Sequence, residues 1–141
     1  MSNLPGNDSS PEPIREKGRP VILSLLALFS MVYTALLAGL FLLSLFYSGD
    51  IARVRMLYDP QNSFAGSHLQ LFFGAAFLLH LVAFAGALLI WKSRKSGYYL
   101  FALSCLLLFA GHLFQPQFSP GANMVYIILP ILLGMFFPRL R

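Results

Sequence analysis

The longest uncharged apolar segment places the strongest constraint on how this chain can fold. No charged residue occurs between Val21 and Tyr47. A helix needs about 20 apolar residues to cross the hydrocarbon core of a bilayer, so the segment predicts a membrane-spanning helix that tilts or projects beyond the core. Its apolar run is also longer than the apolar core of a signal peptide, which has roughly 7–15 residues. We therefore expect it to remain in the mature protein as a span.

Three further apolar segments predict an all-α, four-span transmembrane helical bundle. The composition agrees, because 57% of the residues are hydrophobic and only 11% are charged, whereas soluble domains carry about 25% charged residues. Residues 1–20 are polar and proline-containing, and we expect them to form a disordered cytoplasmic tail. Residues 21–141 then form one transmembrane domain. The expected spans cover about residues 21–47, 69–91, 98–114 and 122–137.

The connections differ in length and in charge. Residues 48–68 form the longest connection. The sequence is compatible with two structures there: a short surface helix capped by Asp50, or an irregular loop. Residues 92–97 form a tight basic connection. The proline-containing segment 115–121 breaks the helix before the fourth span. Within that span, Pro130 removes one backbone hydrogen bond, which favours a kink.

The distribution of basic residues predicts the orientation of the spans. Positive residues accumulate on the cytoplasmic side of membrane proteins. Eight of the ten lysines and arginines lie in the tail, in the second connection or at the C-terminal end, and the other two lie in the first connection. We therefore expect both termini to be cytoplasmic, in a cell membrane and specifically a bacterial cytoplasmic membrane. The same clustering at the ends of apolar segments is typical of membrane anchoring, and we expect no binding to nucleic acid.

Small and hydroxyl residues at helical spacing predict which face of each span points inward. Lipid supplies no hydrophobic drive between helices, so helix interfaces favour residues that allow close approach. One such stripe occurs in each span, and we expect the four stripes to face one another. The stripes are Ala27, Ser30, Thr34 and Ala38; Ala76, His80, Ala83 and Ala87; Ala102, Cys105, Phe109 and His112; and Asn123, Tyr126, Pro130 and Gly134.

His80 is the most informative residue of these stripes. It lies near the middle of its span, where a polar side chain is costly unless it has a partner. Counting about 1.5 Å per residue from the cytoplasmic ends places Thr34 and Tyr126 at a similar depth. We expect His80 to be a neutral interior histidine that bonds Ser30, Thr34 or Tyr126, so these four residues are the predicted interior polar contacts.

Binding of a haem or a quinone is the alternative to a purely structural role for the histidines in the spans. A membrane haem takes axial histidines from neighbouring helices, and His80 and His112 form the only candidate pair in the spans. His112 lies near the outer end of its span, where a histidine can reach the interface, and His68 precedes the second span. The leading prediction is that the chain holds no cofactor and no metal.

The remaining motifs argue against an enzyme. All five acidic residues lie outside the expected spans, whereas proton- or cation-coupled transporters carry acids within them. The single cysteine, Cys105, rules out paired-cysteine thiol chemistry. No hydrolase motif or phosphate-binding glycine loop occurs. We expect a non-enzymatic accessory or assembly component that contacts the lipid bilayer and other membrane subunits or further copies of itself. An electron-transfer subunit using His80 and His112, and a pore or carrier for a neutral solute, stay open as alternatives.

Overall fold

The computed structural model describes residues 20–58, 67–113 and 120–140, and these residues form helices without any strand. The tail at residues 1–19, the predicted turn after Tyr58 and most of the third connection lie outside them. The all-α prediction is confirmed. The elements are α1 (Val21–Phe46), α2 (Ser48–Tyr58), α3 (Ser67–Trp91), α4 (Lys95–Leu113), α5 (Pro120–Asn123), α6 (Val125–Gly134) and the 3-10 turn η1 (Phe137–Arg139).

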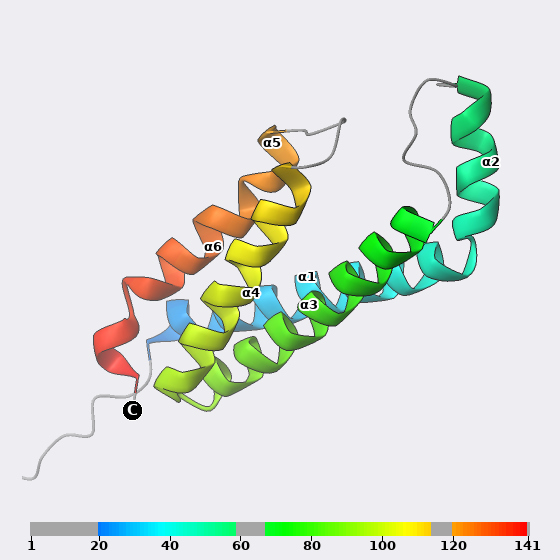
Figure 1. Cartoon of the computed structure of the whole chain (residues 1–141). Helices are drawn as coiled ribbons and strands as arrows, with labels where there is room; N and C mark the ends of the chain where they lie inside the picture. Colours follow the sequence, from blue (N-terminus) through cyan, green and yellow to red (C-terminus); the bar gives the residue numbers. More distant parts are fainter. Residues whose placement is uncertain (1–19, 59–66, 114–119, 141) are drawn as a thin grey trace, which may run out of the picture.

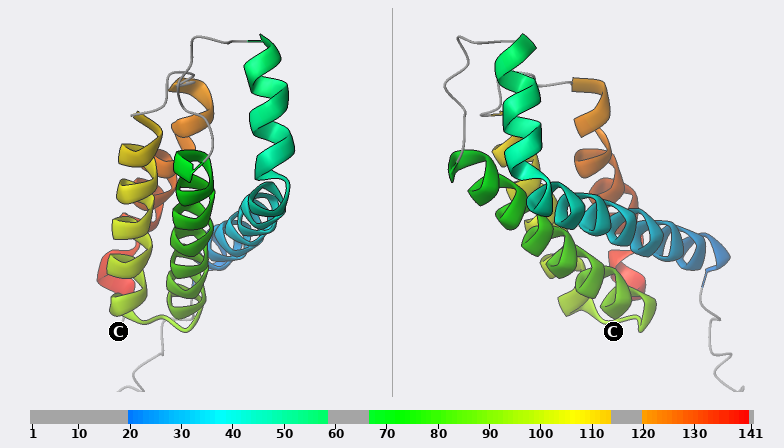
Figure 2. Two further views of the ribbon diagram at one scale, coloured as in Figure 1. Left: turned by 45° about the vertical axis from the view of Figure 1, so that its right-hand side comes forward. Right: turned by 90° about the vertical axis from the view of Figure 1, so that its right-hand side faces the viewer.

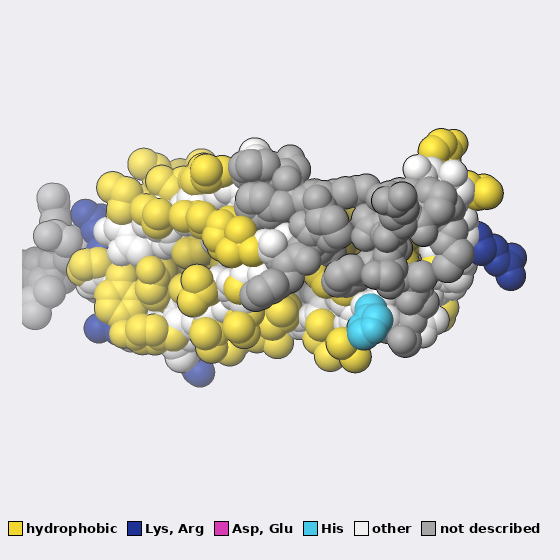
Figure 3. All heavy atoms as spheres, turned by 45° about the horizontal axis from the view of Figure 1, so that its top comes forward, with side chains coloured by type: hydrophobic (Ala, Val, Ile, Leu, Met, Phe, Trp, Pro, Cys, Tyr) yellow, Lys and Arg dark blue, Asp and Glu magenta, His cyan; other side chains and the backbone are white. Residues whose placement is uncertain are grey.

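Three of these helices, α1, α3 and α4, are long and apolar enough to cross a membrane, and α6 is a shorter apolar helix. Many of their large hydrophobic side chains point outward; Leu36 is 69% exposed, Leu71 76% and Ile131 61%. Figure 3 shows this apolar surface on one face of the molecule, with lysine and arginine side chains at the two ends. A surface of this kind requires lipid as its solvent.

The apolar helices pack in the order α1, α3, α4, α6, and α6 also touches α1. Figure 1 shows α3 extending beyond the end of α4, and Figures 1 and 2 show α2 turning away from the end of α1. The first connection therefore contains the short helix and is not wholly irregular. Its helix begins at Ser48, and Asp50 lies in its first turn, which corrects the predicted cap. The Gln70 amide nitrogen donates a 3.1 Å hydrogen bond to the Ser48 hydroxyl and ties α2 to α3.

The turn between α3 and α4 is tighter than predicted. Helix α4 begins at Lys95 rather than at residue 98, because the end of α3 closes within three residues. The backbone N–H of Arg94 donates to the Leu89 carbonyl at 2.9 Å, and that of Ser93 donates to the Ile90 carbonyl at 2.8 Å. This is the Schellman pattern of helix termination. Ser93 takes the left-handed position with φ 60°, which is usually filled by glycine.

Two glycines let α3 and α4 approach closely just beyond this turn. A Cβ atom added at Gly97 would lie 2.6 Å from the backbone nitrogen of Ile90. A Cβ added at Gly86 would lie 2.7 Å from the backbone nitrogen of Phe101. Both obstacles are backbone atoms, so neither can move aside without shifting a helix. Contact through small residues is the usual basis of helix association in lipid.

The fourth apolar segment is not one continuous helix over residues 122–137. It is divided into α5, then α6, which contains Pro130 and ends at Gly134, then η1. A ring contact of 5.2 Å between Tyr98 and Phe137 brings η1 beside the start of α4. The Lys95 ammonium lies 5.8 Å from the centre of the Phe137 ring. The end of the described chain therefore lies at the same end of the molecule as the α3–α4 turn (Figure 1).

Candidate functional site

The first two predicted stripes form the inner faces of α1 and α3. All eight of their residues are buried, and the least covered of them, Ala38, is 4% exposed. The hydroxyls on α1 nevertheless bond within their own helix. Ser30 Oγ donates to the Leu26 carbonyl at 2.8 Å, and Thr34 Oγ1 donates to the Ser30 carbonyl at 2.7 Å. These hydroxyls therefore do not provide the partner of His80.

His80 is completely buried on α3 and both of its ring nitrogens have partners. Nδ1 lies 2.7 Å from the Ala76 carbonyl oxygen, one turn earlier in the same helix. Nε2 lies 3.1 Å from the phenolic oxygen of Tyr126 on α6. Of the three partners considered from the sequence, Tyr126 is the one that the structure places against this ring.

The carbonyl of Ala76 determines how the protons are arranged. A carbonyl oxygen can only accept a hydrogen bond, so Nδ1 of His80 must carry the proton. In the neutral ring, Nε2 then holds a lone pair and accepts the proton of the Tyr126 hydroxyl. The pair is thus a directed chain from Tyr126 through His80 to the backbone of α3. All polar groups of the imidazole are satisfied, as the membrane interior requires.

His112, in the last turn of α4, has the same local arrangement. Its Nδ1 lies 2.7 Å from the Leu108 carbonyl, so Nδ1 carries the proton and Nε2 of the neutral ring holds a lone pair. The side chain is half-buried. The His112 ring centre lies 5.5 Å from that of Tyr126. His68, the third histidine, lies exposed in the first turn of α3.

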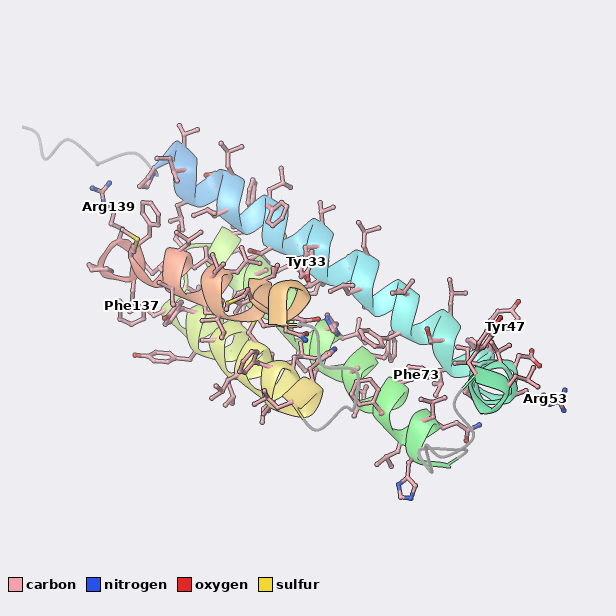
Figure 4. All side chains as sticks on the ribbon, turned by 90° about the horizontal axis from the view of Figure 1, so that it is seen from above. Tyr33, Tyr47, Arg53, Phe73, Phe137 and Arg139 are labelled. Atoms are coloured by element: carbon pink, nitrogen blue, oxygen red, sulfur yellow. The ribbon has the colours of Figure 1, made fainter. Side chains whose placement is uncertain are left out.

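Aromatic rings from α1 and α3 surround the two histidines. The Phe41 ring lies 5.1 Å from His80 and 6.5 Å from His112. Phe72 lies 5.7 Å from His112. In Figure 4, Phe73 lies between α3 and α1, and Tyr33 lies on α1 near the start of the α5–α6 segment. Phe73 contacts Phe41, and Tyr33 contacts Tyr126. Helices α1, α3, α4 and α6 thus each contribute a ring to one aromatic and imidazole cluster.

The inner faces of α4 and α6 are rotated relative to the predicted stripes. Of the α4 stripe, only Cys105 is buried; Ala102, Phe109 and His112 are half-buried. The buried residues of α4 are Gly97, Phe101, Ser104, Cys105 and Leu108. Of the fourth stripe, Asn123 on α5 and Tyr126 on α6 are buried, whereas Pro130 and Gly134 are only half-buried. The other buried residues of α6 are Leu129 and Leu133. Both faces therefore include large apolar side chains, which a pattern of small residues does not mark.

The chemistry available in this cluster is limited to hydrogen bonding and aromatic contact. No group of three or more potential metal ligands occurs among the described residues. A haem held between His80 and His112 would have to break the His80–Tyr126 hydrogen bond and displace the Tyr126 ring, which contacts both histidines. The arrangement thus favours His80 as a neutral residue in an interior hydrogen bond over His80 as an axial ligand of a haem.

No known protein family, curated protein or solved structure matches this chain.

Proposed function

We propose that the chain is a multi-pass protein of a bacterial cytoplasmic membrane with four crossings, the fourth made by the α5–α6 segment. Support comes from the position of η1 beside the start of α4, because α6 must then run back along α4 toward the α3–α4 turn. Lys92, Arg94, Lys95 and Arg139 are all exposed near that end. The positive-inside rule makes that end cytoplasmic and places α2 on the opposite side.

In this membrane the chain acts as a non-enzymatic accessory or assembly component that binds another membrane protein through α1. The supporting observation is the outer face of α1, the side of the helix opposite its buried stripe. Ala35 and Gly39 are exposed on it, and a Cβ added at Gly39 would meet no atom within 4 Å. A second helix can approach closely over such residues. Larger exposed side chains flank them: Leu25, Leu28, Val32, Leu36 and Leu43.

The interior supports a structural rather than a catalytic role. His80 has both nitrogens bonded, Ser30 and Thr34 bond within α1, and the thiol of Cys105 is buried. Among the described residues, the only acid is Asp50 on α2, so no carboxylate is available near His80 to orient it as a general base. The described contacts provide no support for a solute carrier.

Site-specific photocrosslinking in native membranes tests this proposal. A photoreactive residue at Leu36, on the outer face of α1, should give one discrete protein adduct. The matched position is Ile131 on α6, which is exposed to a similar extent and should give lipid adducts only. The Leu36 adduct should disappear when Gly39 is replaced by leucine, because the larger side chain prevents close approach. Lipid adducts alone at Leu36 would refute a protein partner on this face.

A further inference from the structure

Among the described residues of the aromatic and imidazole cluster, one ring nitrogen, Nε2 of His112, has no hydrogen bond. The Leu108 carbonyl fixes the proton of His112 on Nδ1, so Nε2 of the neutral ring presents a lone pair. No described residue bonds this nitrogen. His80 differs, because Tyr126 already occupies its Nε2 at 3.1 Å. The two histidines therefore have distinct roles, and only His112 can receive a hydrogen bond from a ligand.

The surroundings of His112 favour a flat aromatic ligand. Its ring meets Phe72 and Phe41 edge-on and lies tilted against Tyr126. Aromatic rings pack well in such edge and offset arrangements. The neighbouring Gly111 carries no side chain, and a Cβ added there would meet no atom within 4 Å, so α4 is not covered at that position. Because His112 is half-buried in the last turn of α4, a lipid-soluble ligand can reach it from the bilayer.

The direction of the internal hydrogen bonds selects the chemistry of the ligand. Tyr126 gives its proton to His80, and its oxygen already has the Tyr33 hydroxyl as a hydrogen-bond partner. His112 Nε2 is therefore the acceptor that this part of the cluster offers to a ligand. A ligand that donates from a ring hydroxyl is favoured. A ligand with only carbonyl or ether oxygens would leave the His112 nitrogen without a partner, which is costly in an apolar site.

We propose that the His112 cluster binds the hydroquinone head of a membrane quinol and prefers this reduced form to the quinone. The hydroquinone O–H donates to His112 Nε2, and its ring packs against Phe41 and Phe72. The proposal concerns binding only and is independent of a protein partner on α1, since it uses a different surface. Failure of one experiment therefore leaves the other proposal intact.

Calorimetric titration of the full chain in phosphatidylcholine nanodiscs tests the site. The probes are decyl-benzoquinol under anaerobic conditions, its oxidised quinone, its dimethyl ether and cyclohexanol, each corrected for partitioning into empty nanodiscs. The quinol should bind saturably with one site per chain. The quinone and the ether should bind about tenfold more weakly, which is the effect of one lost hydrogen bond. Cyclohexanol, which donates a hydroxyl but has no aromatic ring, should bind more weakly than the quinol.

A pair of matched variants then identifies the acceptor. His112→Phe keeps a ring but removes the lone pair, and it should weaken quinol binding about tenfold without affecting the ether. His68→Phe changes an exposed histidine outside the cluster and should leave all affinities unchanged. In the unmodified protein, ¹⁵N resonances should show the quinol shifting Nε2 of His112 and not that of His80. Equal affinity for quinol and ether, no saturable binding, or an unshifted His112 resonance would each overturn the proposal.

Discussion

Nε2 of His80 on α3 and the hydroxyl of Tyr126 on α6 lie 3.1 Å apart, although 46 positions separate them in the chain. Their rings also meet edge-on at 5.8 Å. Helix α6 packs mainly along α4, so this hydrogen bond supplies a direct polar link from the short fourth helix to α3. It also gives the imidazole its second partner in an apolar interior.

The first prediction is that the His80–Tyr126 bond contributes measurably but modestly to stability. Tyr126→Phe removes the hydroxyl and leaves Nε2 of His80 without its donor. A double-mutant cycle with His80→Phe should give a coupling free energy of about 0.6 kcal/mol, and below about 2 kcal/mol, as measured for other interhelical hydrogen bonds in membranes. Unfolding in mixed micelles measures it. Tyr58→Phe, on an 87% exposed tyrosine, is the control. Additive effects of the two cluster variants would show that the bond does not form.

The second prediction concerns the close approach of α3 and α4. Gly97→Ala should lower the free energy of unfolding by about 1–3 kcal/mol, because its methyl group would overlap backbone atoms of α3 that cannot move independently. Gly74→Ala on α3 is the matched control, since a Cβ at Gly74 meets nothing within 4 Å. Thermal unfolding in detergent compares the two. A Gly97→Ala variant as stable as Gly74→Ala would mean that the helices are further apart than described.

The third prediction concerns haem. The protein purified from cells supplied with haem should be colourless, because Tyr126 lies against both histidine rings and occupies Nε2 of His80. An absorption spectrum in the Soret region measures this directly. A stoichiometric Soret band that is lost in both His80→Ala and His112→Ala would replace the structural role of His80 with axial ligation.

The sequence predicted the inner faces of α1 and α3 well because polarity marks them. Ser30, Thr34 and His80 are polar residues within apolar helices, and alanines occur at helical spacing on the same faces. Polar groups avoid lipid, so their positions determine the rotation of each helix. The same reasoning failed for part of α4. Phe101 is completely buried there, yet in lipid a buried phenylalanine and an exposed one look alike in sequence, because both environments are apolar.

Two features of the site required three-dimensional information. Helical depth placed both Thr34 and Tyr126 near His80, but it did not show that Thr34 satisfies its hydroxyl on the Ser30 carbonyl, as threonines in helices commonly do. The contact between Gly86 and Gly97 was also missed. The sequence shows a glycine on each side of a short basic turn. These two glycines can be recognised as a helix contact only when the turn is known to close within three residues.

The number and direction of the membrane crossings are the central claim, and cysteine accessibility in intact cells tests it most directly. Cys105 is buried, so single cysteines can be added at the exposed positions Leu57, Ser96 and Pro138. An impermeant maleimide should label Leu57→Cys in intact cells, and Ser96→Cys and Pro138→Cys only after permeabilisation. This result places the α3–α4 turn and η1 together on the inner side. Labelling of both Pro138→Cys and Leu57→Cys in intact cells would show that α5–α6 does not cross the membrane. Labelling of Ser96→Cys and Pro138→Cys, but not of Leu57→Cys, in intact cells would show the opposite orientation.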